Sequence, residues 1–212
     1  MTFEKEITVE TKLSFEELDK VLKENGFVIK EVYDVFDKYL TKKEDIDKSD
    51  CLKTLSKSIL IRNVKDGNDK KYIMYKYKKY NKNNEIVKQG SIKCNTDSLE
   101  KAEELFNALE YYKLIEINDH ITVYANDKTE LNVQEVNGKH IYIEMEQTCN
   151  YVNKKYINVN EMIYDLESYL IPYEKGNYYV KKAEIELKEE LNLKEWEMNI
   201  IHFFFCQNML LL

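Results

Sequence analysis

Two short segments, far apart in the chain, alternate charged and apolar side chains. EKEITVETKL, near the N-terminus, carries Glu6, Glu10 and Lys12 on one side, and HIYIEMEQ, far downstream, carries Glu144 and Glu146 on one side. A period of two places alternate side chains on opposite sides of a β-strand. Each segment is therefore expected to be a strand with one charged face. Carboxylates repeated in this way on two strands favour a barrel with a charged interior and an apolar outer wall.

Length and charge restrict the class of protein. The chain has 212 residues, enough for one domain with a hydrophobic core, and a formal net charge of −7. This acidic balance argues against a nucleic-acid-binding surface. The cysteines Cys51, Cys94, Cys149 and Cys206 show no metal-binding or disulfide spacing, and the N-terminus has no apolar leader segment. We therefore expect a cytoplasmic protein.

The order of expected elements is that of an α+β fold with about eight antiparallel strands. Ser14 and Glu17 form a capping-box pattern for the first helix, and Asn137-Gly138 is a strong hairpin signal. Strands are expected at residues 4–13, 27–40, 58–64, 71–80, 85–94, 114–125, 130–136 and 139–147. Helices are expected at residues 14–26, 98–109, 157–170 and 177–192.

The charged residues sort by strand. Carboxylates concentrate on the first and eighth expected strands, and bases on the third to fifth, including Arg62 and Lys76. For any single strand, a solvated polar face is the simpler explanation of the alternation. The segregation of the two signs favours a shared lumen, in which carboxylates bind Mg²⁺ or Mn²⁺ and Lys and Arg bind phosphates.

Five short motifs occur in the order expected for one family. They are Thr8-Val9-Glu10-Thr11-Lys12, Asp37-Lys38-Tyr39, ILIR at 59–62, Lys76 within YKYK, and Glu144-Met145-Glu146. Over about residues 1–185 they resemble the CYTH superfamily of triphosphate tunnel metalloenzymes, which includes class IV adenylyl cyclases, thiamine triphosphatases and inorganic triphosphatases. The resemblance implies an antiparallel eight-stranded β-barrel that forms a tunnel, with helices packed outside. Residues 186–212 would then be a helical and apolar tail.

The resemblance also implies roles for particular residues. Carboxylates would hold Mg²⁺ or Mn²⁺, Lys and Arg side chains would contact the phosphates, and three residues would be catalytic. The expected metal ligands are Glu10, Glu144, Glu146 and Glu130. The expected phosphate ligands are Lys12, Arg62, Lys76, Lys78 and Lys88. The expected catalytic residues are Glu10, Lys12 and Glu144.

Several positions depart from the family pattern. At these positions, uncharged side chains replace charged groups of the family. Such groups stabilise the charge that develops in the transition state, so their loss weakens catalysis. The sixth expected strand has Asn118 and His120 where the family has bases. The other departures are Thr8, Leu60, Ser91 and Asn132.

Metal-dependent hydrolysis of a triphosphate-containing substrate, inorganic or organic, ranks first because it needs fewer specific parts than cyclisation. The alternatives are a class IV-type adenylyl cyclase and a catalytically weakened polyphosphate- or nucleotide-binding protein. We expect a small-molecule partner and no nucleic-acid or membrane partner, and a homodimer remains open. The apolar residues 197–212 are expected to dock as a helix on the barrel or on a partner subunit, with a membrane contact as a minor alternative. A structural scaffold that uses this tail would have no polyphosphate affinity.

Overall fold

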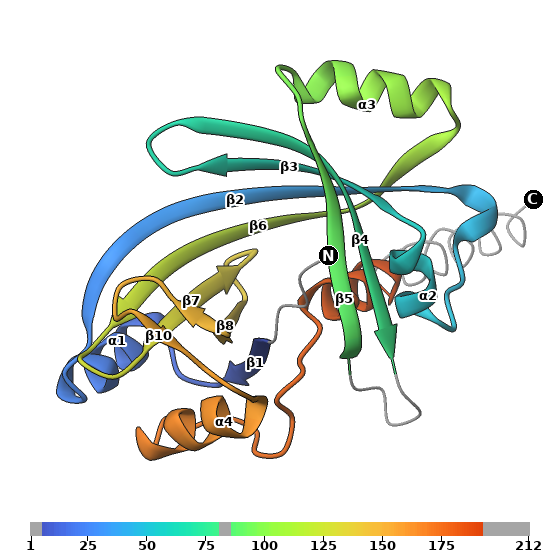
Figure 1. Ribbon diagram of the computed structural model, residues 1–212. Coiled ribbons are helices and arrows are strands. Elements are labelled where there is room, and N and C mark those ends of the chain that lie inside the picture. The colour runs from blue at the N-terminus through green and yellow to red at the C-terminus, as the bar shows by residue number, and fades with distance from the viewer. Residues whose placement is uncertain (1–5, 81–85, 193–212) are drawn as a thin grey trace, which may run out of the picture.

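The structure is a computed structural model that describes residues 6–80 and 86–192, without the side chains of 78–80 and 86–89. It is an α+β fold with a curved antiparallel sheet (Figure 1). The sheet strands are β1 (Glu6–Thr11), β2 (Val28–Lys42), β3 (Ile59–Lys65), β4 (Asp69–Tyr80), β5 (Ile86–Asn95), β6 (Tyr111–Ala125), β7 (Glu130–Val136) and β8 (His140–Glu146). The helices are α1 (Phe15–Glu24), η1 (Lys43–Asp45), α2 (Cys51–Ser56), α3 (Leu99–Ala108) and α4 (Val159–Ser168), and residues 182–192 are also helical. The short strands β9 (Thr148–Cys149) and β10 (Lys154–Lys155) form a separate hairpin.

The eight long strands form one antiparallel sheet in the order β1-β8-β7-β6-β2-β3-β4-β5, which confirms the expected strand number and orientation. In Figure 1, β2 and β6 run side by side as two long curved strands, and β4 and β5 cross in front of them. Among the described residues, no backbone pairing joins β1 to β5, so closure of the curled sheet into a barrel stays a prediction. The outer edge of β1 pairs instead with a later segment: Thr8 N–H donates to Tyr178 O at 3.0 Å, and Val180 N–H donates to Thr8 O at 3.1 Å.

Local sequence signals account for several of these elements. The side chain of Ser14 accepts a hydrogen bond from Glu17 N–H, and the side chain of Glu17 accepts one from Ser14 N–H, so the expected capping box is present. Gly26 follows α1 with a φ of +78°, which ends the helix. Asn137 and Gly138 both have positive φ, and they are the central residues of a tight turn that a hydrogen bond from Lys139 N–H to Val136 O closes.

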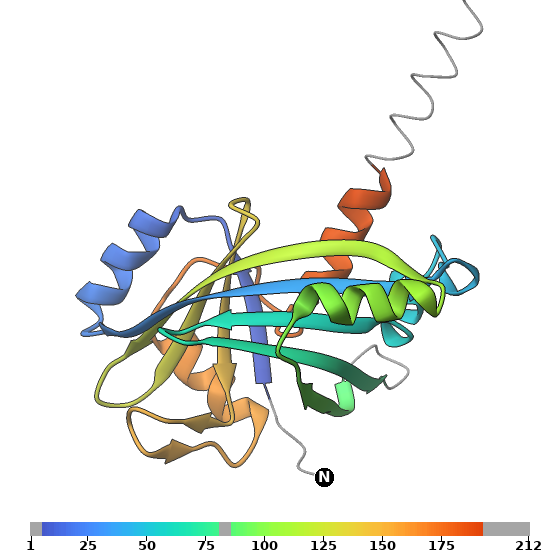
Figure 2. The same cartoon turned by 90° about the horizontal axis from the view of Figure 1, so that it is seen from above.

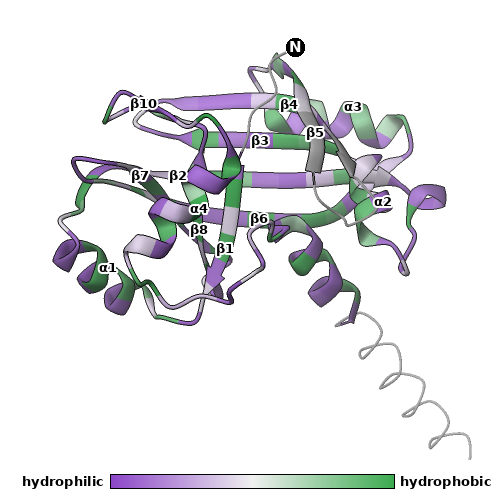
Figure 3. Cartoon of the chain, turned by 60° about the horizontal axis from the view of Figure 1, so that its bottom comes forward, coloured by the Kyte–Doolittle hydropathy of each residue, from purple (hydrophilic) through white to green (hydrophobic). Residues whose placement is uncertain are grey.

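Helices cover the outer side of the sheet in two places. Leu18 and Leu22 of α1 and Met162 and Leu166 of α4 belong to one apolar cluster with β1, β7 and β8. Ala102 of α3 belongs to a separate cluster with β2 and β3. Figure 2 shows that α1 and α3 lie far apart on the sheet. Figure 3 shows polar and apolar residues alternating along the long strands, as expected for a sheet with two different faces.

The helix at residues 182–192 lies on the concave side, which corrects the expectation that all helices pack outside. Its Leu187 is fully buried in a cluster with Met74, Ile117 and Tyr142. These three strand residues precede Lys76, Asp119 and Glu144 by two positions, so they share a face with those charged side chains. The helix therefore fills one end of the space that the sheet encloses. The expected boundary at residue 185 falls within it, and the residues 197–212 lie outside the described part of the chain.

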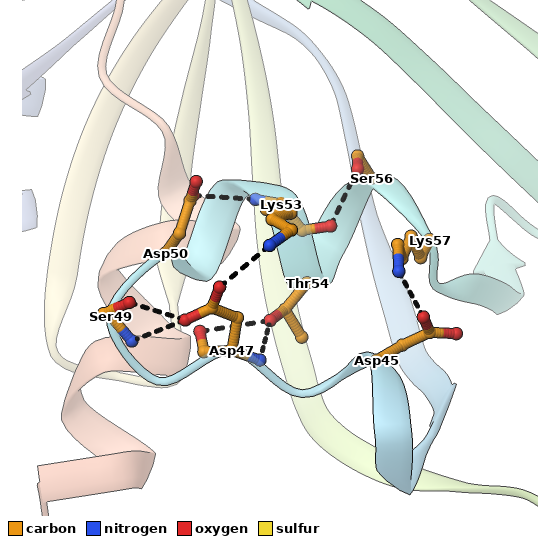
Figure 4. Close-up of polar contacts among 8 residues, drawn as sticks. All are labelled: Asp45, Asp47, Ser49, Asp50, Lys53, Thr54, Ser56 and Lys57. Carbon is orange, nitrogen blue, oxygen red and sulfur yellow. Dashed lines mark hydrogen bonds and ion pairs between the residues drawn. The ribbon is translucent and has the colours of Figure 1, made fainter.

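The segment before α2 is held by a small polar network around Asp47 (Figure 4). The Asp47 carboxylate accepts hydrogen bonds from Ser49 and lies 3.1 Å from Lys53 Nζ. These contacts lower the pKa of Asp47 to about 2. Its backbone N–H donates to Thr54 Oγ1 at 2.8 Å, and Asp50 caps α2 by accepting from Lys53 N–H. The network fixes α2 beside the concave face.

No helix among the described residues is long and apolar enough to cross a membrane.

Replacing Leu187 by Ala should lower the free energy of unfolding by about 2–5 kcal/mol, because a fully buried side chain is removed from the concave core. Urea unfolding followed by circular dichroism measures the change. Leu105 of α3 is 55% exposed, and Leu105→Ala is the matched control with a change within about 0.5 kcal/mol. Equal effects of the two substitutions would contradict the inner position of the helix.

Candidate functional site

The concave side of the sheet encloses a cavity of about 680 Å³. All eight long strands contribute side chains or backbone to its wall, which places the two end strands of the sheet, β1 and β5, around one space. The lining residues are Glu6, Glu31, Tyr33, Val35, Arg62, Val64, Asp66, Met74, Lys76, Tyr77, Gly90, Ser91, Asp119, Ile121, Asn132, Gln134, Glu144, Glu146 and Lys182.

Four of the residues singled out from the sequence line this cavity. They are Arg62 of β3, Lys76 of β4, and Glu144 and Glu146 of β8. Carboxylates and bases that are up to 84 positions apart in the chain thus face a common space. The side chains of Lys78 and Lys88 lie outside those that the structure describes.

Three other predicted site residues are not among the lining residues. Glu10 lies 3.0 Å from His140 Nδ1, Lys12 is 83% exposed, and Glu130 accepts a hydrogen bond from Tyr151 N–H. The register of β1 against β8 gives the reason, because it pairs Glu6 with Glu146 while Glu10 lies opposite Tyr142. Glu6, on the same face of β1 as Glu10, is the β1 carboxylate that lines the cavity.

The inner face of β6 is the reverse of the expected one. Asp119 and Ile121 line the cavity, whereas His120 pairs with Asp34 on the exposed side at 2.7 Å. The apolar residues Ile115 and Ile117 also face inward, because the C-terminal helix packs there. A period-two pattern identifies the two faces of this strand but assigns them the wrong way round when part of the interior is apolar.

Arg62 is held at the cavity wall by Asp37. Its Nε and Nη2 donate to the two oxygens of the Asp37 carboxylate at 2.6 and 2.5 Å. Burial alone would lower the pKa of Arg62, but the adjacent Asp37 carboxylate outweighs burial and raises the pKa above its usual value. This bidentate pair fixes the plane of the guanidinium.

Lys182 brings a third base into the cavity from the first turn of the C-terminal helix. It donates to Gln134, and its Nζ lies 3.5 Å from Glu144 and 3.6 Å from Asp119. Burial opposes its charge, but Glu144 and Asp119 raise its pKa above the usual value. No sequence motif indicated this residue, which follows β8, the last strand of the main sheet, by 36 positions.

The pKa of Asp119 is also raised, which for a carboxyl group favours the neutral form. Burial raises its pKa to about 6, and although Lys182 favours the carboxylate, the charges of Glu144 and Asp37 add to the increase. Asp119 thus exchanges a proton close to neutral pH.

Gly90 allows an aromatic side chain to form part of the wall. It lies directly opposite Tyr77 in the β4–β5 pair, and a Cβ at this position would lie 2.3 Å from Tyr77 Oη. A glycine in the interior of a strand often marks such a close approach. Tyr77 can therefore lie across β5 and line the cavity.

Carboxylates outnumber bases among the described lining residues. Six carboxylates, from Glu6, Glu31, Asp66, Asp119, Glu144 and Glu146, face three bases, from Arg62, Lys76 and Lys182. Glu6 and Glu146 are direct cross-strand partners, and like charges in such a pair repel each other. A cation between them would remove this repulsion.

The donor set on β1 and β8 suits a hard divalent cation. Mg²⁺ and Mn²⁺ bind carboxylate oxygens, and Glu6, Glu144 and Glu146 supply such oxygens from adjacent strands. Among the described residues, no three acidic, histidine or cysteine side chains already surround a common point. The match to the ion is therefore limited to the oxygen chemistry of these carboxylates and their positions on adjacent strands.

Comparison with solved structures shows which proteins share this fold. The PH1819 protein from Pyrococcus horikoshii superposes with a TM-score of 0.60 and 18% identity, covering 88% of this chain and 99% of that one. A candidate adenylate cyclase from Vibrio parahaemolyticus gives 0.52 and 10%, covering 85% and 94%. A candidate adenylyl cyclase from Hippeastrum, described as having a dominant triphosphatase activity, gives 0.54 and 15%, covering 85% and 93%.

These comparisons show that the chain shares the fold of these proteins, as the resemblance in the sequence led us to expect. Comparison with protein-family models and with curated protein sequences finds no significant match to this chain.

Asp119→Asn should stabilise the protein at pH 7. The pKa of Asp119 is about 6 in the folded protein and 3.8 as the usual value. The folded protein therefore loses stability as the pH rises from about 3.8 to about 6, because the buried carboxyl group must ionise. The expected gain is about 1–3 kcal/mol at pH 7, and it should disappear near pH 4. Urea unfolding at the two pH values measures it. A variant that is less stable than wild type at pH 7 would contradict the assignment.

Proposed function

We propose that the cavity binds the triphosphate group of a small molecule together with Mg²⁺ or Mn²⁺ and hydrolyses its terminal phosphate. The proposal rests on one observation: carboxylates from β1 and β8 and bases from β3, β4 and the C-terminal helix line the same cavity. A triphosphate carries several negative charges, so it would need both contacts to basic side chains and a divalent cation to enter a cavity rich in carboxylates.

Glu6, Glu144 and Glu146 would hold the divalent cation. When bound, it neutralises phosphate charge and polarises the phosphorus–oxygen bonds. The assignment replaces Glu10 by Glu6, because Glu6 is level with Glu146 in the β1–β8 pair. Glu130 is also left out, since its carboxylate lies with Tyr151.

Lys76, Arg62 and Lys182 would bind the phosphate oxygens. All three line the cavity, and Asp37 orients the guanidinium of Arg62 before any ligand arrives. The charge of Lys182 is already supported by Glu144 and Asp119, so it can exchange part of these contacts for a phosphate. Charge-assisted hydrogen bonds of this kind position the chain of phosphates and reduce the charge that repels a nucleophile.

Asp119 would accept the proton of the attacking water. Its pKa of about 6 keeps most of it ionised at neutral pH, so it can act as a general base. The water oxygen forms a bond to the terminal phosphorus, the bridging phosphorus–oxygen bond breaks, and the leaving phosphate chain takes the electron pair. Basic contacts from Lys76 and Lys182 would offset the charge on that leaving group.

Two alternatives keep specific support. A class IV-type adenylyl cyclase would direct a ribose 3′-hydroxyl at the α-phosphate, and two structures with this fold are described as candidate cyclases. A binding protein with weakened catalysis is favoured by the uncharged positions: Ser91 and Asn132 line the cavity, and Leu60 is buried in the core beside the C-terminal helix. A homodimer and a cytoplasmic location stay predictions.

Lys76→Ala should weaken the binding of tripolyphosphate about tenfold to a hundredfold, because one charge-assisted contact is lost. Isothermal titration calorimetry at low salt with Mg²⁺ measures the affinity, which should fall as salt is added. Lys113 is 55% exposed and pairs with Glu116, so Lys113→Ala is the matched control and should bind like wild type. Equal affinity of wild type and the Lys76→Ala variant would refute the phosphate role.

Glu144→Gln should abolish turnover that depends on Mg²⁺ or Mn²⁺, since an amide is a poorer ligand for a hard cation than a carboxylate. The assay offers tripolyphosphate, thiamine triphosphate and ATP, and scores phosphate, pyrophosphate and cyclic AMP. Glu116→Gln, on an exposed side chain, is the control.

Cyclic AMP as the product of wild type would favour the cyclase. Binding of tripolyphosphate without turnover of any of the three compounds would favour the binding protein. Full activity of the Glu144→Gln variant would exclude the metal role of this residue.

A further inference from the structure

His140 connects three elements that meet at the end of the sheet filled by the C-terminal helix. It begins β8, and its Nδ1 lies 3.0 Å from Glu10 Oε1 of β1. Its Nε2 lies 2.9 Å from Glu189 Oε1, near the end of the described part of the helix. Only 20% of the His140 side chain is exposed. One imidazole is thus held between two carboxylates from different elements.

Both contacts require a particular protonation state. An ionised carboxylate only accepts hydrogen bonds, and an imidazole donates from both ring nitrogens only as the imidazolium. Burial alone lowers the pKa of His140, but the hydrogen bonds to Glu10 and Glu189 outweigh burial and raise the pKa above the usual 6.5. A neutral ring would direct the lone pair of one nitrogen at a carboxylate oxygen, so one of the two hydrogen bonds would be lost.

The other charged and titratable groups around His140 do not replace this bridge. Lys12 lies 3.5 Å from Glu10, and Lys139 lies 3.4 Å from Glu189, so each reaches one carboxylate only. The ring of Tyr142 stacks on His140 with a centroid distance of 5.9 Å, and Glu186 of the helix bonds to Asn137. Of the groups described here, His140 alone contacts both Glu10 and Glu189.

We propose that the imidazolium of His140 holds the C-terminal helix against β1 and β8, and that loss of its proton loosens the helix from the concave face. The helix carries Lys182 at its start, Leu187 in its middle and Glu189 beyond, so His140 positions Lys182 in the cavity through the helix. The direction of the pH dependence follows from the raised pKa of His140. Both contacts of the imidazolium, to Glu10 and Glu189, are present below pH 6.5, and they are lost as the pH rises through the folded-state pKa of His140. His140 is a positioning residue, since it does not line the cavity.

Cys51 provides a direct readout of helix docking. Its thiol is 4% exposed and belongs to the same apolar cluster as Leu187. The charges of Lys188 and Glu184 on the helix act on its pKa, which burial raises. Loosening the helix would therefore expose Cys51 to a thiol reagent.

The experiment labels the full-length protein with a maleimide at pH 6.0 and pH 8.5 and measures labelling at each cysteine by peptide mass spectrometry. The exposed Cys94 serves as an internal reference for the rise of thiol reactivity with pH. The ratio of Cys51 to Cys94 labelling should rise about tenfold in wild type, the size expected for losing one hydrogen bond to a charged group. Cys149, buried in the other main cluster, should stay protected.

Glu189→Gln is the decisive variant. The amide can donate to a neutral imidazole or accept from a charged one, so the Cys51 to Cys94 ratio should not change with pH. His120→Gln is the matched control, because it removes a histidine–carboxylate pair on the outer side of the sheet and should leave the wild-type pH dependence unchanged.

A wild-type ratio that is equal at the two pH values would overturn the proposal, as would an undiminished rise in the Glu189→Gln variant. Labelling of Cys149 in parallel with Cys51 would show general opening and would also overturn it. The experiment uses no phosphate ligand, so its outcome does not depend on the proposed hydrolase function.

Discussion

The packing of residues 178–192 against the sheet is the contact on which the cavity depends. Backbone hydrogen bonds join Tyr178 and Val180 to Thr8 at the edge of β1. Leu187 then fills the concave side, and Lys182 enters the remaining space. One short segment therefore supplies an edge contact, part of the core and a cavity base. The sheet alone would leave its apolar inner residues in contact with water, which is unfavourable.

Features that depend on local sequence could be predicted. The capping box at Ser14 and the turn at Asn137-Gly138 involve residues next to each other in the chain, so their chemistry specifies their conformation. The sharing of one cavity by Arg62, Lys76 and Glu144 could also be predicted, because a period of two determines the faces of a strand. Eight antiparallel strands follow from the same alternation together with the turn signals between them.

Features that depend on distant packing could not be predicted. Alternation shows that Glu6 and Glu10 share a face, but only the register against β8 shows which of them is level with Glu146. The inward direction of Asp119 depends on the apolar helix that packs beside it, and so does the role of Lys182. Closure of the sheet depends on whether β1 meets β5 or another segment, and period-two patterns contain no information on that choice.

The position of β1 in the sheet has a consequence for synthesis on the ribosome. β1 pairs with β8, whose residues are made more than 120 positions later, and its other edge pairs with residues near 180. β1 thus leaves the ribosome long before its edges can be paired, because one edge waits for β8 and the other for residues near 180. Contacts this far apart in sequence form slowly, and an unpaired strand edge is prone to associate with other chains. During translation, the hydrophobic side of β1 is the surface that a chaperone would need to cover.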